Sequence, residues 1–174
     1  MAEIGKDPVP NTPADAVVAL DSHLPIVLRG KTMSEVGWER PDLLTLYIPL
    51  SGQRADGKED EYMLRLNFGY YPEWPPSAQF VNPQTKQYLY PDDVSWLPHF
   101  EGNSGIAMHT AYKNESCPQG RQLICCSMTL EFYLVRHGVD PRHLWNSKRD
   151  NFAATLNAIR GVLQQPYYKG RQAR

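Results

Sequence analysis

The fold is decided by a stretch that reads YMLRLNFGYYPEWPPSAQFV, from Tyr62 to Val81. Its first seven residues alternate between apolar and polar or long side chains, and this period of two is typical of a half-buried strand. The alternation predicts one buried face, made of Tyr62, Leu64, Leu66 and Phe68. The prolines that follow cannot continue a ladder because they lack backbone N–H donors. The stretch therefore predicts a strand, a rigid turn and, from Ser77, a second strand.

Strand signals extend on the N-terminal side of this stretch. Residues 43–50 are rich in β-forming side chains, and the polar segment 51–60 contains glycine and clustered charge, which is typical of a hairpin loop. Residues 43–82 are therefore predicted to form an antiparallel meander, with a fourth strand before it. The long segment 83–121 has little regular pattern, and connections of that length are usually functional or disordered.

Two helices are predicted, one before the meander in the chain and one after it. Residues 14–24 carry apolar groups at helical spacing after a capping Thr12-Pro13, and Pro25 is expected to end this helix. Near the C-terminus, Ser147 and Asp150 have the spacing of a capping box. The helix that they introduce is expected to bury one stripe, made of Phe152, Leu156, Ile159 and Leu163, and to stop at Gln165-Pro166.

Residues 122–135 are compatible with two structures. Their apolar side chains alternate strictly, which favours a strand, although the length also suits a buried helix. With the strand preferred, the chain is predicted to be an α+β domain at 14–168. Residues 1–13 are expected to be a flexible arm and residues 169–174 an exposed basic tail.

The overall composition excludes several classes of protein. The 174 residues suggest one domain, and 41% hydrophobic residues suffice for a core. The formal net charge is −1, whereas nucleic-acid-binding domains usually carry an excess of positive charge on one face. No apolar run reaches the ~20 residues that a membrane-spanning helix needs. The N-terminus lacks a signal-peptide core, and three cysteines suit a reducing compartment, so a cytoplasmic protein is expected.

The segment from Trp96 to His109 has the composition of an ordered functional loop, with two glycines and two histidines. His99 and His109 could move protons near neutral pH, but Ala107, which lies between them, has no chemistry. A metal site is a second interpretation of the residues that could act as ligands. No Cys-x-x-Cys or His-x-x-x-His spacing supports it, so no metal and no cofactor is predicted. These residues are His99, His109, Cys117, Cys125 and Cys126.

The order of elements resembles that of the ubiquitin-conjugating enzyme fold. The segment from Tyr71 to Phe80 is similar to that family's Tyr-Pro-x-x-Pro-Pro-x-x-x-Phe signature, at the same spacing. Trp145-Asn146-Ser147 resembles the family's Trp-Ser-Pro entry to its crossing helix, and Gln165-Pro166-Tyr167 resembles the exit. The resemblance covers roughly residues 14–168. It implies a four-stranded meander, an N-terminal helix and a C-terminal crossing helix.

The same resemblance implies an active site. Gly105-Ile106-Ala107-Met108 is similar to the family's Gly-x-Ile-Cys-Leu segment, shortened by one residue, so Ala107 takes the place of the thioester-forming cysteine. On this mapping His99 takes the place of the oxyanion-stabilising asparagine, for which Asn103 is another candidate. His109 takes the place of a residue near the incoming amine. Trp145, Tyr71 and the prolines after it are expected to be structural.

The long segment between Met108 and Trp145 resembles the stand-alone conjugating-enzyme-like proteins of bacterial antiphage operons. Those proteins act beside a cyclic-nucleotide synthase in cyclic-oligonucleotide signalling. The resemblance implies that the C-terminus of the synthase is carried as a cysteine thioester and passed to an amine, commonly with the help of an activating enzyme. No nucleotide-binding motif is present in this chain, so either a separate activating enzyme or an unorthodox chemistry is expected.

An alanine at position 107 leaves three interpretations open, because alanine can neither attack an acyl group nor leave from one. In the first, a cysteine was replaced to trap a complex; in the second, the chain is a natural adaptor that only binds; in the third, another cysteine acts. Cys117 is expected to be exposed in a polar loop, whereas Cys125 and Cys126 lie in an apolar run. A general small-molecule-binding domain is a further alternative.

Overall fold

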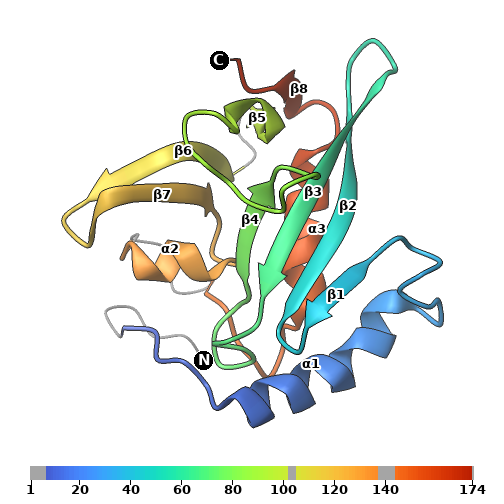
Figure 1. Ribbon diagram of the computed structural model, residues 1–174, viewed down its shortest axis with the longest axis vertical. Coiled ribbons are helices and arrows are strands. Elements are labelled where there is room, and N and C mark those ends of the chain that lie inside the picture. Colours follow the sequence, from blue (N-terminus) through green and yellow to red (C-terminus); the bar gives the residue numbers. More distant parts are fainter. Residues whose placement is uncertain (1–6, 102–104, 137–143, 174) are drawn as a thin grey trace.

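The computed structural model describes residues 7–101, 105–136 and 144–173. It is an α+β fold with an N-terminal helix, a four-stranded antiparallel meander and later helices, as the sequence predicted. Figure 1 shows α3 against one face of the meander, α1 across its lower end and the β6–β7 hairpin to one side. The elements in chain order are α1 (Pro13–Leu28), β1 (Glu39–Asp42), β2 (Thr45–Gln53), β3 (Glu59–Asn67), β4 (Ser77–Val81), a 3-10 turn (Val94–Trp96), β5 (Pro98–Phe100), β6 (Ala107–Asn114), β7 (Cys117–Cys125), α2 (Leu130–Leu134), α3 (Phe152–Val162) and β8 (Tyr168–Arg171).

The meander follows the predicted pattern. Its strand order is β1-β2-β3-β4, and each neighbouring pair is antiparallel. The predicted inward face of β3 is confirmed, because all four of its apolar residues are buried. The hairpin loop is shorter than the predicted 51–60, since β2 continues to Gln53 and β3 begins at Glu59. Nine consecutive residue pairs join these two strands, which makes them the rigid centre of the fold.

The first helix begins where the sequence predicted and ends later. The Thr12 hydroxyl accepts a hydrogen bond from the Asp15 N–H at 3.2 Å, and Pro13 occupies the first turn. The predicted end at Pro25 is wrong, because α1 continues to Leu28. Proline there removes one N–H donor on an exposed side of the helix, where water can bond the released carbonyl.

The proline-rich turn ties both long helices to the meander. The Tyr71 hydroxyl, which is fully buried, accepts a hydrogen bond from the Phe152 N–H at the start of α3, at 3.3 Å. The same hydroxyl hydrogen-bonds to Nδ1 of His23 on α1. Trp145 donates from Nε1 to the Pro72 carbonyl at 2.9 Å and has no exposed surface. Tyr71 and Trp145 are therefore structural, as the sequence predicted.

The capping box predicted at Ser147 is wrong. Asn151 caps α3 instead, and its side chain accepts a hydrogen bond from the Ala153 N–H at 2.9 Å. Asp150 closes the preceding turn by accepting from the Asn146 N–H at 2.9 Å. The apolar stripe of the helix is nevertheless confirmed, since all four predicted residues are at most 1% exposed.

The strand predicted over 122–135 is wrong in its second half. Residues 122–125 do belong to β7, but the chain then turns and forms the short helix α2 (Figure 1). Both elements dock on the outer edge of β4 through buried polar side chains. Gln122 accepts from the Phe80 N–H at 2.6 Å and donates to the Phe80 carbonyl at 2.8 Å. The Glu131 carboxylate accepts from the Ala78 N–H at 3.0 Å. An edge that could pair with another chain is thereby covered.

The sequence predicted an exposed tail at 169–174, but residues 169–171 belong to β8. β8 pairs with β5, and Tyr168 is 1% exposed. The Tyr168 hydroxyl lies 2.5 Å from the Tyr62 hydroxyl and donates to the Asp60 carboxylate at 2.7 Å. Within the predicted arm, the Asn11 N–H donates to the Gly69 carbonyl at 2.9 Å, so this segment is anchored to the domain.

Candidate functional site

The β6–β7 hairpin holds most of the residues that the sequence singled out. In its ladder Ala107 pairs with Cys125, and His109 pairs with Leu123. Paired residues of neighbouring strands point to the same face, and so do residues two apart on one strand. The base of the hairpin therefore presents Ala107, His109 and Cys125 together on one face. The sequence had placed Cys125 only as an alternative nucleophile, and its proximity to position 107 was not predicted.

The three side chains differ in their access to solvent. Ala107 is exposed, while His109 and Cys125 are half-buried. The His109 ring meets the Tyr112 ring edge-on, with 5.2 Å between ring centroids. Ala107 has no atoms beyond Cβ, so it places no long side chain opposite Cys125. Cys125 itself packs against the buried cluster of Cys117, Leu123 and Val135 and keeps only part of its surface exposed.

Burial governs the acidity of the two adjacent thiols. Desolvation raises the pKa of Cys125, and it raises the pKa of Cys126 to about 11. Cys126 is 8% exposed, and its sulfur accepts a hydrogen bond from the Met128 N–H at 3.4 Å. At neutral pH both groups are therefore thiols rather than thiolates. Of the two, Cys125 is the more exposed to a reagent.

The expectation that Cys117 is exposed is wrong. It is the first residue of β7, pairs with Asn114 and is 8% exposed. It packs in a small cluster with Leu123 and Val135, where free cysteine behaves as a small apolar residue. A reactive role for Cys117 therefore has no geometric support.

His99 lies away from the hairpin face. His99 belongs to β5, which pairs with β8, and its Nε2 lies 3.4 Å from a Glu101 carboxylate oxygen. Its side chain is 41% exposed. β5 contacts β6, so His99 belongs to the neighbouring strand rather than to the ladder that holds Cys125. Asn103 lies outside the described residues.

A cavity of about 460 Å3 opens beside β6, lined by Thr110 and by residues that include Tyr90, Val94 and Gln172. It could hold part of a bound chain, and it borders the strand that carries His109. Among the residues that the structure describes, no group of three or more His, Cys, Asp or Glu side chains is placed to share a metal ion. In the same described ranges, no helix is both long and apolar enough to span a bilayer.

Sequence reasoning missed the buried polar groups that hold the hairpin in place. Glu131 is 3% exposed and receives hydrogen bonds from the Ser77 hydroxyl and the Ala78 N–H. Burial raises the pKa of this carboxyl group. Gln122 is 2% exposed and bonds both backbone groups of Phe80. The only signal in the sequence was a polar residue inside an otherwise apolar run.

The fold and the hairpin define an α+β protein with a partly accessible thiol and an imidazole at the base of a β-hairpin. No protein-family model matches the chain, and neither the curated proteins nor the solved structures include a significant match.

Proposed function

We propose that this chain is a ubiquitin-conjugating-like domain that carries an acyl group as a cysteine thioester and passes it to an amine. The acyl group would be the C-terminus of a partner protein, by resemblance a bacterial cyclic-nucleotide synthase. Two features support the fold assignment: the order of helix, meander, proline-rich turn and crossing helix, and the position of Tyr71 and Trp145 between turn and helix.

The observation that carries the proposal is the pairing of Ala107 with Cys125. Directly opposed residues in an antiparallel ladder have Cβ atoms about 4.5–5.5 Å apart. A thiol from β7 therefore lies beside the position where the resemblance expects the nucleophile on β6. We assign the nucleophile to Cys125, with His109 on the same face as the group that assists the amine.

The reaction has two steps. In the first, the Cys125 thiol gives up its proton to solvent and its sulfur attacks the carbonyl carbon of an activated C-terminus; a C–S bond forms, and the bond to the activating group breaks as that group leaves with the electron pair. In the second, an amine attacks the thioester carbonyl, a C–N bond forms, and the sulfur leaves as a thiolate. His109 accepts the proton that the amine loses, and the thiolate is reprotonated from solvent. The activated donor comes from a separate activating enzyme, since this chain has no nucleotide-binding motif.

A non-catalytic adaptor is the second candidate, and one observation favours it. A nucleophilic cysteine usually has a lowered pKa, whereas burial raises the pKa of both Cys125 and Cys126. In an adaptor the same hairpin face would bind the partner's tail without forming a bond. The two candidates differ in whether a covalent adduct forms.

The test measures adduct formation by intact mass and by a non-reducing gel. The chain is incubated with the synthase, its activating enzyme and ATP, and separately with a fluorescent peptide that ends in a glycine thioester. The variants are Cys125→Ala, the matched control Cys126→Ala, and the double variant Ala107→Cys/Cys125→Ala, which moves the thiol across the ladder.

We expect a hydroxylamine-sensitive adduct on the unmodified chain and on Cys126→Ala, none on Cys125→Ala, and recovery in the double variant. An adduct that survives Cys125→Ala would refute the assignment of the nucleophile. Tight binding of the synthase tail with no adduct on any form would establish the adaptor instead.

A further inference from the structure

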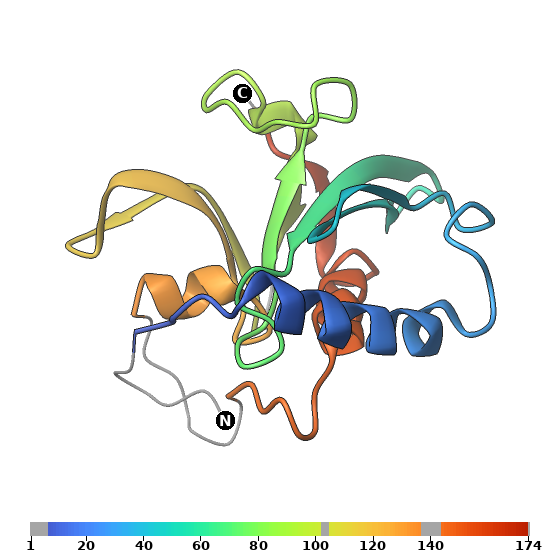
Figure 2. The same cartoon turned by 60° about the horizontal axis from the view of Figure 1, so that its bottom comes forward.

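A second open site lies on the other side of the molecule from the β6–β7 hairpin. A cavity of about 530 Å3 opens between the end of α1, the segment that follows it, and one side of α3. Its floor contains Trp38 and Leu156, which are 8% and 1% exposed, and the partly buried Val36. Ile26 at its rim is 61% exposed. We call this cavity the α1–α3 groove. Figure 2 shows the two helices that border it.

The charge of the α1–α3 groove is positive. The groove is lined by three cationic side chains, Arg29, Lys31 and Arg160. None of the described residues that line it carries a carboxylate. The carboxylate of Glu35, which accepts a hydrogen bond from the Thr32 N–H, interacts electrostatically with Lys31. The Arg29 and Arg160 guanidinium groups have neither a hydrogen-bond nor an ion-pair partner in the described part of the chain. Two unpaired guanidinium groups therefore remain at the edge of an apolar floor.

The two guanidinium groups also lie close enough to repel each other. Partial burial and, to a smaller extent, the positive charge of Arg29 lower the pKa of Arg160. A like-charge pair of this kind is unfavourable unless an anion is placed between the charges. A bound carboxylate would remove the repulsion and could accept a paired hydrogen bond from either guanidinium.

A structural explanation accounts for only part of this arrangement. Cations are common at helix C-termini, and Arg29 caps α1 while Arg160 lies in the last turn of α3. That preference explains each arginine separately. It does not explain why both line the same cavity, or why the cavity has a tryptophan and a leucine at its base.

We propose that the α1–α3 groove binds an acidic segment of a partner protein. The carboxylates of the segment would pair with Arg29 and Arg160, and at least one apolar side chain would lie on Trp38 and Leu156. Charge complementarity selects the acidic partner, and the apolar floor selects a peptide over a nucleic-acid backbone, which offers only phosphates and sugars to such a surface. The proposal does not depend on thiol chemistry at the hairpin.

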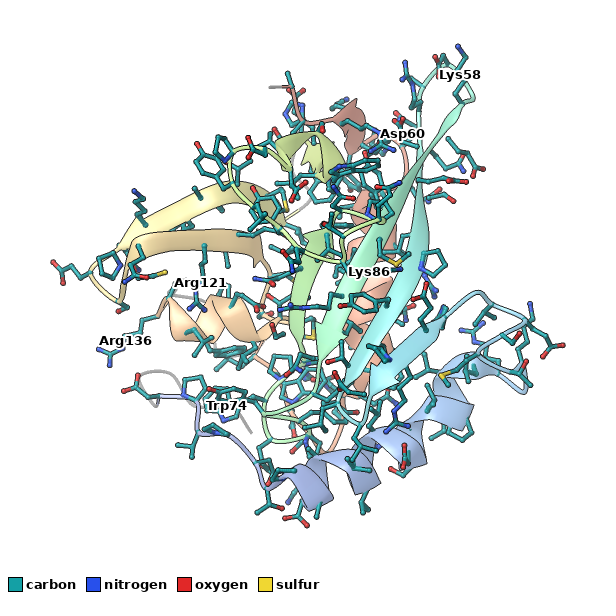
Figure 3. The ribbon with its side chains drawn as sticks, in the orientation of Figure 1. Lys58, Asp60, Trp74, Lys86, Arg121 and Arg136 are labelled. Atoms are coloured by element: carbon teal, nitrogen blue, oxygen red, sulfur yellow. The ribbon has the colours of Figure 1, made fainter. Side chains whose placement is uncertain are left out.

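The experiment is a fluorescence-anisotropy titration with the full chain. The probe is a fluorescein-labelled 12-residue peptide of alternating Asp and Glu with two leucines and one phenylalanine. Its control has Asn and Gln in place of the acids. The variant is Arg29→Glu/Arg160→Glu, with each single reversal made as well; the control for each single reversal is Lys58→Glu, at the tip of the β2–β3 hairpin far from α1 (Figure 3). Circular dichroism and urea unfolding check that each variant is folded.

We expect the acidic probe to bind at 50 mM salt at least tenfold more tightly than its neutral control, and more weakly at 500 mM salt. The double reversal should lose at least tenfold in affinity, whereas Lys58→Glu should change affinity less than twofold. Equal binding of both probes, an equal loss in Lys58→Glu, or no binding of the acidic probe would overturn the proposal. Stronger competition by a single-stranded oligonucleotide than by the peptide would overturn it in favour of a nucleic-acid ligand.

Discussion

Substitution of Gly52 by alanine is expected to create a steric clash with the Tyr168 ring. A Cβ at position 52 would lie 2.5 Å from Cζ of Tyr168 and 2.8 Å from both Cε atoms. Ordinary contacts begin at about 3.4 Å, so the ring would have to move by about 0.9 Å, the difference between 3.4 and 2.5 Å. The ring cannot move freely, because its hydroxyl is hydrogen-bonded to Tyr62 and Asp60. Gly52→Ala therefore forces either a displaced strand or broken hydrogen bonds.

The expected cost follows from these two contributions. Overpacking of this kind costs about 1–3 kcal/mol, and weakening two hydrogen bonds costs about 1 kcal/mol each. We expect Gly52→Ala to lower the free energy of unfolding by about 3–5 kcal/mol. That is a large fraction of the roughly 5–15 kcal/mol that stabilises a typical domain.

Urea unfolding, followed by circular dichroism, measures this change. Gly161→Ala is the matched control, because Gly161 lies within α3 and nothing is within 4 Å of its added Cβ. We expect it to stabilise by about 0.5–1 kcal/mol, through helix propensity. In a double-mutant cycle with Tyr168→Ala, the cost of Gly52→Ala should largely disappear, because the ring that it meets is gone. A cost below 1 kcal/mol, or additive effects in the cycle, would refute the reasoning.

Three further substitutions or reactions probe the turn, the β4 edge and the thiols. Tyr71→Phe removes the acceptor of the Phe152 N–H and should cost about 1–3 kcal/mol in urea unfolding; an unchanged midpoint would contradict this. Burial raises the pKa of Glu131, so its stabilising contribution is complete below the ordinary value of 4.5 and is lost as the pH rises through the folded-state pKa. Glu131→Gln cannot ionise, so its stability relative to the unmodified chain should increase from pH 4.5 to pH 8, and a constant difference would argue against this account. Iodoacetamide should alkylate Cys125 faster than Cys126. Because the pKa of each thiol is raised, the rate of alkylation should rise about tenfold per pH unit from pH 7. A rate that is constant above pH 7 would contradict the raised pKa.

The meander was predictable because its signals are local. Alternation with period two fixes which face of β3 is buried, and prolines mark the turn between β3 and β4. The later elements were less predictable, because tertiary contacts override the pattern. The alternation over 122–135 runs through both a strand and a helix, since Gln122 and Glu131 are fastened to β4 by long-range hydrogen bonds. Residues 168–171 form a strand only because β5 lies beside them.

The candidate site was predictable only in part. Motif spacing drew attention to Ala107 and His109, and the hairpin does present both on one face. The burial of Cys117 could not be read from its polar neighbours, because it depends on packing against Leu123, farther along the same strand, and against Val135, which follows α2. His99 was grouped with His109 by closeness in sequence, but the two belong to different sheets.

The pairing of β6 with β7 changes the question that an alanine at position 107 raises. Spacing along one strand suggests that chemistry at this place requires a cysteine at 107, so that the residue there distinguishes an enzyme from an adaptor. In an antiparallel ladder, however, the same place is shared by a residue from the neighbouring strand, here eighteen positions later, at 125. A small residue at 107 places no long side chain opposite the thiol at 125. On the proposed function, the residue whose substitution distinguishes transfer from binding is therefore Cys125, whatever the origin of the alanine opposite it.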